Sequence, residues 1–239
     1  MSKILSSKPL GALFLLISLL GLSAGSACAQ SSEKLCGDLA NAYGPFDYRR
    51  YHGSGDIVTG AHFTPTVESL KSGKTSNTAG GDIDYTLRAI PNYHRALIAV
   101  IRLGEKEKTD QPRGMRYTVE CWLERAARFQ PDDTVVRMIF ATYLVKKQRK
   151  AEARQQLDAV KNLAQDNALT HYNLGMVYAD MEDYEEALDQ AHQAIELGYD
   201  SPGLRDRLKA VGKWREPVKT EIEDLSPVVE NAAPRASPK

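Results

Sequence analysis

The sequence predicts an all-α protein whose second half is a stack of helix–turn–helix units. Two observations lead to this prediction. Small and large apolar residues recur at helical spacing, and the same pattern returns after about 34 residues. In the last unit, Asp183-Tyr184 lies between two such apolar groups, as expected for a turn between two helices. A period of this length indicates a solenoid, because one such unit cannot bury its apolar face alone.

The charge balance excludes one broad class of partner. The 239 residues include 31 basic and 31 acidic side chains, and 42% are apolar. Two of the basic residues, Lys3 and Lys8, lie in an N-terminal stretch without acids, and without them 29 basic side chains face 31 acidic ones. A nucleic-acid-binding domain is expected to carry a basic face. The sequence therefore predicts no nucleic-acid partner.

Residues 1–29 have the pattern of a signal peptide. Lys3 and Lys8 precede an apolar run at 10–22, which is shorter than the roughly 20 residues of a spanning helix. Ala27-Cys28-Ala29 then forms a small-residue cleavage site. We expect cleavage after Ala29 and a periplasmic or secreted protein without a membrane span. The alternative is an outer-membrane lipoprotein anchored at Cys28, although Gly25 stands where such a signal needs a branched apolar residue.

Residues 30–90 form a segment rich in glycine and aromatic residues, which we expect to be mostly irregular and to wrap the N-terminal side of the solenoid. A short helix is predicted at 64–71, where Pro65 follows a threonine cap. A flexible loop is predicted at 72–82, and 82–89 is predicted as a helical lead-in to the repeats.

Two cysteines remain after the signal peptide, Cys36 and Cys121. An oxidising compartment favours a disulfide between them, which would attach the N-terminal segment to the helical body. The alternative is that Cys121 is a buried core thiol, because Val119, Cys121 and Trp122 follow a helical pattern. Two cysteines at this separation, without neighbouring ligands, predict no metal site.

Three repeat units are predicted, at 94–133, 134–167 and 168–201. The first has helices at 95–104 and 117–129 and a longer turn between them. The apolar or small positions of the last unit are Leu174, Gly175, Tyr178, Ala187, Ala191 and Ala194. The residues one period earlier are Phe140, Ala141, Leu144, Ala153, Leu157 and Val160.

The unit at 168–201 resembles a tetratricopeptide repeat. The positions that match the family are Leu174, Gly175, Tyr178, Ala187 and Ala194. His171 stands in place of the usual tryptophan, and Ala191 in place of an aromatic residue. The unit at 134–167 is similar, and the resemblance extends over 94–214, about half of the chain. It implies a superhelix of tetratricopeptide-repeat type at 91–214. Together with the predicted signal peptide, this resemblance leads us to expect an exported bacterial protein of this family.

The chain after the last unit is predicted to close the stack. Ser201 and Pro202 are a helix cap and first helical residue, and the capping helix at 202–214 places three apolar residues on one face. These residues are Leu204, Leu208 and Val211, and Trp214 is expected to fold onto the same surface. Residues 215–239 contain four prolines and few large apolar groups, so we expect a disordered tail.

The resemblance also implies where a partner binds, because the first helix of each repeat in this family lines a concave groove. In the middle unit the groove residues are Val135, Met138, Thr142, Val145 and Lys146. In the last unit they are Leu169, Tyr172, Asn173, Met176 and Asp180. This mixed apolar and polar surface suits an extended peptide or a helix of a partner protein. The alternative is that Met138 and Tyr172 only pack against the next unit.

We therefore expect an exported scaffold or adaptor that binds a protein or peptide, in an envelope assembly or transport complex. The sequence contains no catalytic motif: Gly73-Lys74-Thr75 lacks the earlier glycine of a phosphate-binding loop, and no serine stands in a Gly-x-Ser-x-Gly turn. No enzymatic activity, cofactor or metal is predicted. One alternative is a binder of a small ligand or envelope polymer through the aromatic segment 43–63. Another is a lipid-anchored pilot lipoprotein.

Overall fold

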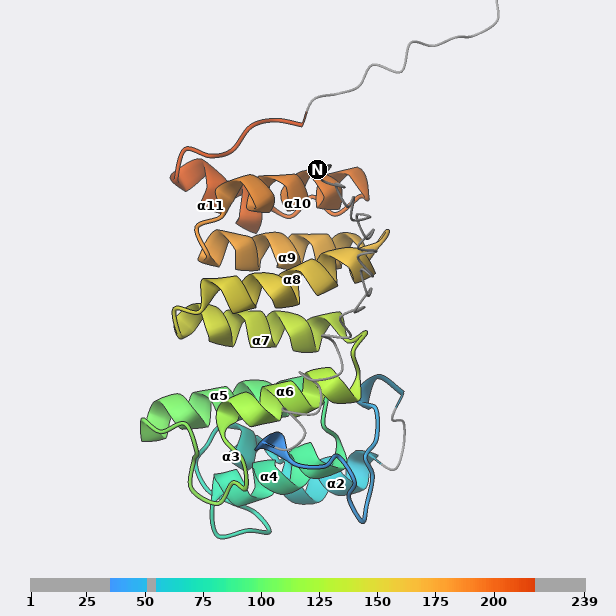
Figure 1. Ribbon diagram of the computed structural model, residues 1–239, viewed down its shortest axis with the longest axis vertical. Helices are drawn as coiled ribbons and strands as arrows, with labels where there is room; N and C mark the ends of the chain where they lie inside the picture. Colours follow the sequence, from blue (N-terminus) through green and yellow to red (C-terminus); the bar gives the residue numbers. More distant parts are fainter. Residues whose placement is uncertain (1–34, 51–54, 218–239) are drawn as a thin grey trace, which may run out of the picture. The chain divides into compact units, whose positions relative to one another are not determined.

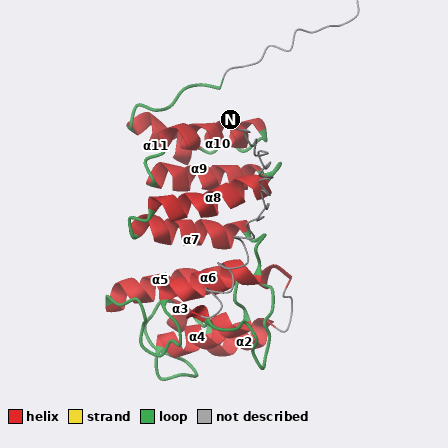
Figure 2. Ribbon diagram, in the orientation of Figure 1, coloured by secondary structure: helices red, strands yellow, loops and turns green. Residues whose placement is uncertain are grey.

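The computed structural model describes residues 35–50 and 55–217, and all regular structure in these ranges is helical (Figures 1 and 2). This confirms the predicted all-α class. The chain divides into two compact units, one that ends at Phe129 and one that begins at Gln130. The predicted signal peptide, with Cys28, and the predicted tail from residue 218 onward lie outside the described residues.

The helices of the second unit follow one another with short connections, whereas the first unit has long loops between α3 and α4 and between α5 and α6 (Figure 1). The first unit contains η1 (Tyr48–Arg50), α2 (Gly55–His62), α3 (Pro65–Glu68), α4 (Ala79–Ala89), α5 (His94–Glu107) and α6 (Val119–Phe129). The second unit contains α7 (Thr134–Lys146), α8 (Lys150–Ala164), α9 (Ala168–Asp180), α10 (Tyr184–Glu196) and α11 (Pro202–Ala210).

In the second unit, the helices pack as the repeat pattern predicts. Helix α7 packs on α8 and α9 packs on α10, while α9 also contacts α7, α8 and α11. The predicted apolar and small positions of both repeats are all buried, from Phe140 on α7 to Ala194 on α10. Burial of a large aliphatic side chain stabilises a fold by roughly 1.5–3 kcal/mol, so these positions dominate the stability of the stack.

The repeat is also visible in the caps and turns. Asp133 and Asn167 occupy equivalent places in adjacent repeats, and their side chains accept hydrogen bonds from Val136 N (3.2 Å) and Thr170 N (2.9 Å) at the starts of α7 and α9. Caps of this kind contribute about 1 kcal/mol each. Gln148 and Glu182, which are also one repeat apart, both have positive φ, at 61° and 64°. The two repeats of the second unit therefore share their turn geometry as well as their pattern of buried residues.

Gly175 shows why the pattern needs a small residue on α9. A Cβ atom at this position would lie 2.5 Å from Cδ2 of Leu204 on α11 and 3.2 Å from the carbonyl oxygen of Ala187 on α10. Contacts this short would force the neighbouring helices apart. The absent side chain thus lets both helices approach α9 closely.

The capping helix α11 is present, and Leu204 and Leu208 are buried as predicted. The prediction for Val211 is wrong: this side chain is 44% exposed, because α11 ends at Ala210 and Val211 belongs to the turn that follows. Ser201 is the N-cap residue, although its side chain makes no capping hydrogen bond. Trp214 lies edge-on to the ring of His192, with ring centroids 5.4 Å apart.

In the first unit, the N-terminal segment is fastened to α6. Cys36 and Cys121 form a disulfide with an S–S distance of 2.06 Å, which confirms the predicted bridge. Beside it, the guanidinium of Arg125 is buried and donates to the backbone carbonyl oxygens of Cys36, Gly37 and Asp38 at 2.7–3.1 Å. An irregular segment is thus held by one covalent bond and by a buried cation that satisfies its carbonyl groups.

The same segment continues along the end of α4 and the connection to α5. Phe46 N donates to the carbonyl oxygen of Ala89 (2.8 Å), and Tyr48 N donates to Oδ1 of Asn92 (2.9 Å). Asn92 is fully buried, and its Nδ2 donates to Oδ1 of Asp47 at 2.7 Å. These contacts attach the N-terminal segment to the connection between α4 and α5.

Three features of the first unit differ from the sequence-based expectations. The helix predicted at 64–71 is shorter, since α3 covers only Pro65–Glu68. Helix α2 has no counterpart among the predicted elements. The segment 72–82, expected to be a flexible loop, ends in the first turn of α4, which begins at Ala79 with Thr78 as its cap. Preceding backbone groups of this segment donate to the buried carboxylate of Asp82. A buried acceptor of this kind organises a polar segment that has no apolar pattern of its own.

Candidate functional site

The predicted groove residues on α7 differ in how much surface they offer. Val135 is 38% exposed and Lys146 is exposed, whereas Met138 is only 8% exposed. Val145 is half-buried, and the hydroxyl of Thr142 donates to the carbonyl oxygen of Met138 within the helix (2.9 Å). The first turn of α7 therefore presents an apolar side chain and the last turn a cation, while Met138 offers little direct contact.

The predicted groove residues on α9 show a similar change of exposure along the helix, with the most exposed side chains in the first and last turns. Leu169 in the first turn is 50% exposed, and it occupies the place of Val135 one repeat later. Asp180 in the last turn is exposed and accepts from Nη1 of Arg207 on α11 at 2.7 Å. Between these ends lie three half-buried side chains, Tyr172, Asn173 and Met176.

Tyr172 lies against Tyr199 and the first turn of α11. Its ring is edge-on to that of Tyr199, with centroids 5.1 Å apart, and its hydroxyl faces Gly203, where a Cβ atom would be 2.5 Å away. Tyr199 is 37% exposed. The two tyrosines and Leu169 thus form an apolar surface at one end of α9. Tyr172 thus packs on the cap, and because it is only half-buried its role in the predicted groove stays a prediction.

Two residues at this surface, Tyr199 and Arg207, were not among the predicted groove residues. Arg207 on α11 occupies the place of Asn173 one repeat later, so extending the repeat into the capping helix would have found it. Tyr199 lies in the turn after α10 and has no aromatic counterpart one repeat earlier, where Gln165 stands. We refer to Val135, Leu169, Tyr172, Tyr199, Asp180 and Arg207 together as the first-helix surface.

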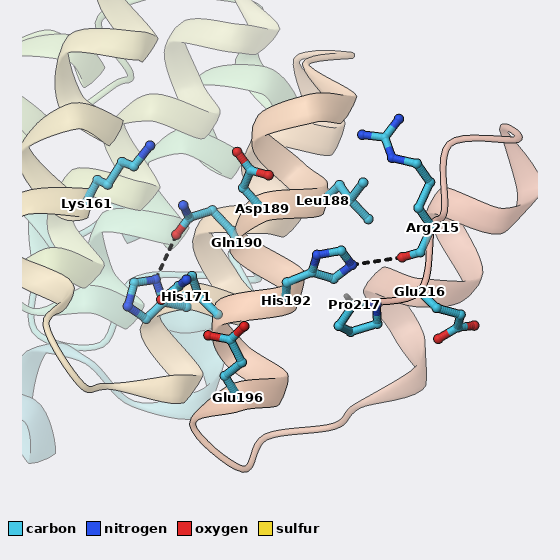
Figure 3. Close-up of a pocket in the computed structure, with 11 residues that line it drawn as sticks. Lys161, His171, Leu188, Asp189, Gln190, His192, Glu196, Arg215, Glu216 and Pro217 are labelled. Carbon is cyan, nitrogen blue, oxygen red and sulfur yellow. Dashed lines mark hydrogen bonds between the residues drawn. The ribbon is translucent and has the colours of Figure 1, made fainter. Parts of the chain in front are cut away.

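A cavity of about 600 Å³ lies on another part of the second unit, bordered by α10 and the residues that follow α11 (Figure 3). Its buried polar groups are already paired. Nδ1 of His171 is 2.7 Å from Oε1 of Gln190, and Nε2 of His171 donates to the carbonyl oxygen of Gln165 at 2.7 Å. Nε2 of His192 donates to the carbonyl oxygen of Arg215 at 2.8 Å (Figure 3). These histidines therefore hold the structure together, as expected for residues inside repeat helices.

The chain from Trp214 to Pro217 closes one side of this cavity. The side chain of Arg215 pairs with Glu185 on α10, with Nη2 and Oε2 2.5 Å apart, and the guanidinium of Arg205 lies over the ring of Trp214. The start of the predicted tail is thus in contact with α10. Exposed ion pairs of this kind contribute little stability, so the contact depends mainly on Trp214 and His192.

Neither a metal centre nor a membrane span is found in the described part of the chain. No group of three or more histidine, cysteine or acidic side chains there is placed to hold a metal ion. No helix within residues 35–50 and 55–217 is both long and apolar enough to cross a bilayer.

Comparison with protein families identifies one match. The family model for the tetratricopeptide repeat matches residues 168–197, the stretch that forms α9 and α10. No curated protein matches the chain. Tetratricopeptide repeats generally mediate protein–protein interactions, and solenoids of this type use extended surfaces for binding. The match, the buried repeat pattern and the helix pairs agree, and the chain contains a tetratricopeptide repeat at residues 168–197.

Proposed function

We propose that the chain is an exported scaffold or adaptor that binds a protein or peptide partner on the first-helix surface and performs no chemistry. The observation that carries this proposal is the pair Val135 and Leu169. These large apolar side chains are 38% and 50% exposed at equivalent places in adjacent repeats. A repeated exposed apolar position beside an aromatic pair is the kind of surface that a partner covers.

The surface favours a partner segment with large apolar side chains. Its apolar part is formed by Val135, Leu169 and the pair Tyr172–Tyr199. At the other end of α9, Asp180 and Arg207 pair with one another, so the surface has no single sign of charge there. Affinity should therefore come from apolar burial, with the polar end fixing the register of the bound segment.

Replacing both Val135 and Leu169 by serine is expected to weaken partner binding by about 10- to 100-fold, since each loses roughly 1 kcal/mol of apolar burial. A photo-crosslinking residue at position 169 would first identify the partner segment in an envelope extract. The affinity of the corresponding synthetic peptide is then measured by calorimetry with the unmodified chain and with the double serine variant.

Leu163→Ser is the matched control, because Leu163 is a 40% exposed leucine on α8, outside the first-helix surface. The control should bind the peptide with unchanged affinity. Equal affinity of the double serine variant, or equal loss in the control, would show that the partner binds elsewhere.

We also propose that the protein is exported and acts in the periplasm or outside the cell, in an envelope complex. The sequence of residues 1–29 motivates this, and the disulfide supports it because stable bridges are rare in reducing compartments. The alternative is a lipid anchor at Cys28. A pilot lipoprotein would need that anchor, whereas a scaffold released by cleavage after Ala29 would not.

The N-terminus of the exported chain separates these possibilities. We expect mass spectrometry of the protein from the periplasmic fraction to show Gln30 as the first residue. Labelled palmitate should not be incorporated. Incorporation that disappears in a Cys28→Ala variant would establish the lipoprotein instead.

A further inference from the structure

The first unit contains a small cavity that the proposed binding of a partner does not use. Its volume is about 230 Å³, and it is lined by Tyr43, Ile57, Val58, Ala61, His62 and Tyr85. All of these except Tyr85 come from the aromatic segment 43–63. Ile57 is 66% exposed and forms part of the rim, whereas Val58 is buried. The walls are thus largely apolar and aromatic.

His62 brings a fixed polar group to this cavity. Its Nδ1 lies 2.8 Å from Oδ1 of Asp82, a residue with no exposed surface. The backbone N–H groups of Lys74, Thr75 and Ser76 donate to the same carboxylate at 2.6–3.1 Å. Burial alone would raise the pKa of Asp82, but the hydrogen bonds from the backbone and from His62 outweigh it and lower the pKa. Asp82 is therefore a charged, immobile acceptor.

The hydrogen bond to Asp82 determines which nitrogen of His62 can accept a hydrogen bond from a ligand. Because a charged carboxylate can only accept, Nδ1 carries a hydrogen and donates it to Asp82. The second nitrogen, Nε2, has no hydrogen-bond partner within residues 35–50 and 55–217. The ring is also held in place by stacking on Tyr85, with centroids 4.0 Å apart and planes at 22°. In neutral His62, Nε2 is a preoriented acceptor beside an apolar cavity.

The size and polarity of the cavity restrict the ligand. Pockets for drug-sized molecules measure about 300–1,000 Å³, so about 230 Å³ suits a single ring with a small substituent. A sugar would bury several hydroxyls among Ile57, Val58 and Ala61, and each unpaired hydroxyl is costly. An anion would find no lysine or arginine among the residues that line the cavity. We propose that this cavity binds a phenol-type aromatic ring, whose hydroxyl donates a hydrogen bond to Nε2 of His62.

The test compares p-cresol with toluene, which has the same ring and methyl group but no hydroxyl. Titration of the full chain by ligand-detected NMR is expected to show p-cresol binding about tenfold more tightly, the contribution of one hydrogen bond. This comparison requires no mutation. Equal affinities for the two compounds, or absence of binding for every phenol tested, would overturn the proposal.

His62→Phe keeps a ring that can stack on Tyr85 but removes Nε2, so the preference for p-cresol should vanish. His192→Phe is the matched control in the second unit and should keep it. A His62→Phe chain that folds and retains the preference would overturn the proposal.

A parallel titration with the peptides Gly-Tyr-Gly and Gly-Phe-Gly identifies the source of the ring. Preferential binding of the tyrosine peptide, lost with His62→Phe, supports a side chain of a partner, and binding of p-cresol alone supports a free phenol.

Discussion

Replacing Cys36 and Cys121 by alanine is expected to lower the free energy of unfolding of the first unit by about 4–5 kcal/mol. The bridge joins residues 85 positions apart, and it therefore removes a large loop-closure entropy from the unfolded chain. The effect should be large because the attached segment has little regular structure of its own. Without the bridge, residues 36–38 are held to α6 within the described part of the chain by hydrogen bonds from Arg125 and Arg128 and by surrounding packing.

The two tryptophans allow each unit to be followed separately. In a Trp214→Phe background, the buried Trp122 on α6 reports urea unfolding of the first unit, and in a Trp122→Phe background Trp214 reports the second. The alanine variant should shift the Trp122 transition and leave the Trp214 transition in place, since the second unit contains no part of the loop.

Reduction provides the control for the disulfide. Dithiothreitol should reproduce the shift in the unmodified chain and have no effect on the alanine variant. Cys28 lies outside the described residues and is treated alike in both chains, whether retained or removed with the predicted signal peptide, so it cancels in the comparison. A loss of less than about 1 kcal/mol would mean that the unfolded chain is already compact enough for the bridge to add little.

The repeats could be predicted from the sequence because their physics is local and periodic. Ala153 and Ala187, for example, lie at equivalent places in adjacent repeats, and each is buried against the other helix of its own repeat. The disulfide could be predicted because only two cysteines, Cys36 and Cys121, follow the predicted signal peptide. The prediction that Val211 is buried on the capping helix was wrong, because the spacing of apolar residues does not by itself show where a helix ends.

The first unit could not be predicted to the same extent. Arg125 lies in a predicted helix as an ordinary polar residue, and its carbonyl partners are 87–89 positions away. The pair His62–Asp82 likewise joins residues from α2 and α4 that share no pattern. A buried polar residue is stable only with its partners, and such partners leave no periodic signal when they lie far apart in the chain. Helix α2 was missed for a related reason, since its sequence GDIVTGAH contains two glycines that disfavour a helix.

Arg125→Leu is expected to destabilise the first unit by about 3 kcal/mol, because a leucine fills the space but donates no hydrogen bond. The side chain of Arg125 is 2% exposed, and its Nη1 serves the carbonyl oxygens of Cys36, Gly37 and Asp38. The carbonyl oxygen of Gly37 also accepts a hydrogen bond from Nη2 of Arg128 at 2.8 Å, and it would keep this bond in the Arg125→Leu variant. Arg128→Leu is therefore the matched control, with an expected loss of about 1 kcal/mol.

The effect of Arg125 should depend on the disulfide. With the bridge present, residues 36–38 stay close to α6, and their carbonyl groups lose a donor without gaining free access to water. In the chain without cysteines at 36 and 121, the segment can move away and hydrate its carbonyl groups. The cost of Arg125→Leu should then fall below about 1 kcal/mol. A double-mutant cycle, followed by the urea transition of Trp122, measures this coupling. Strictly additive losses would show that Arg125 stabilises α6 through Tyr117 and Trp122, over whose rings its guanidinium lies, and not through the N-terminal segment.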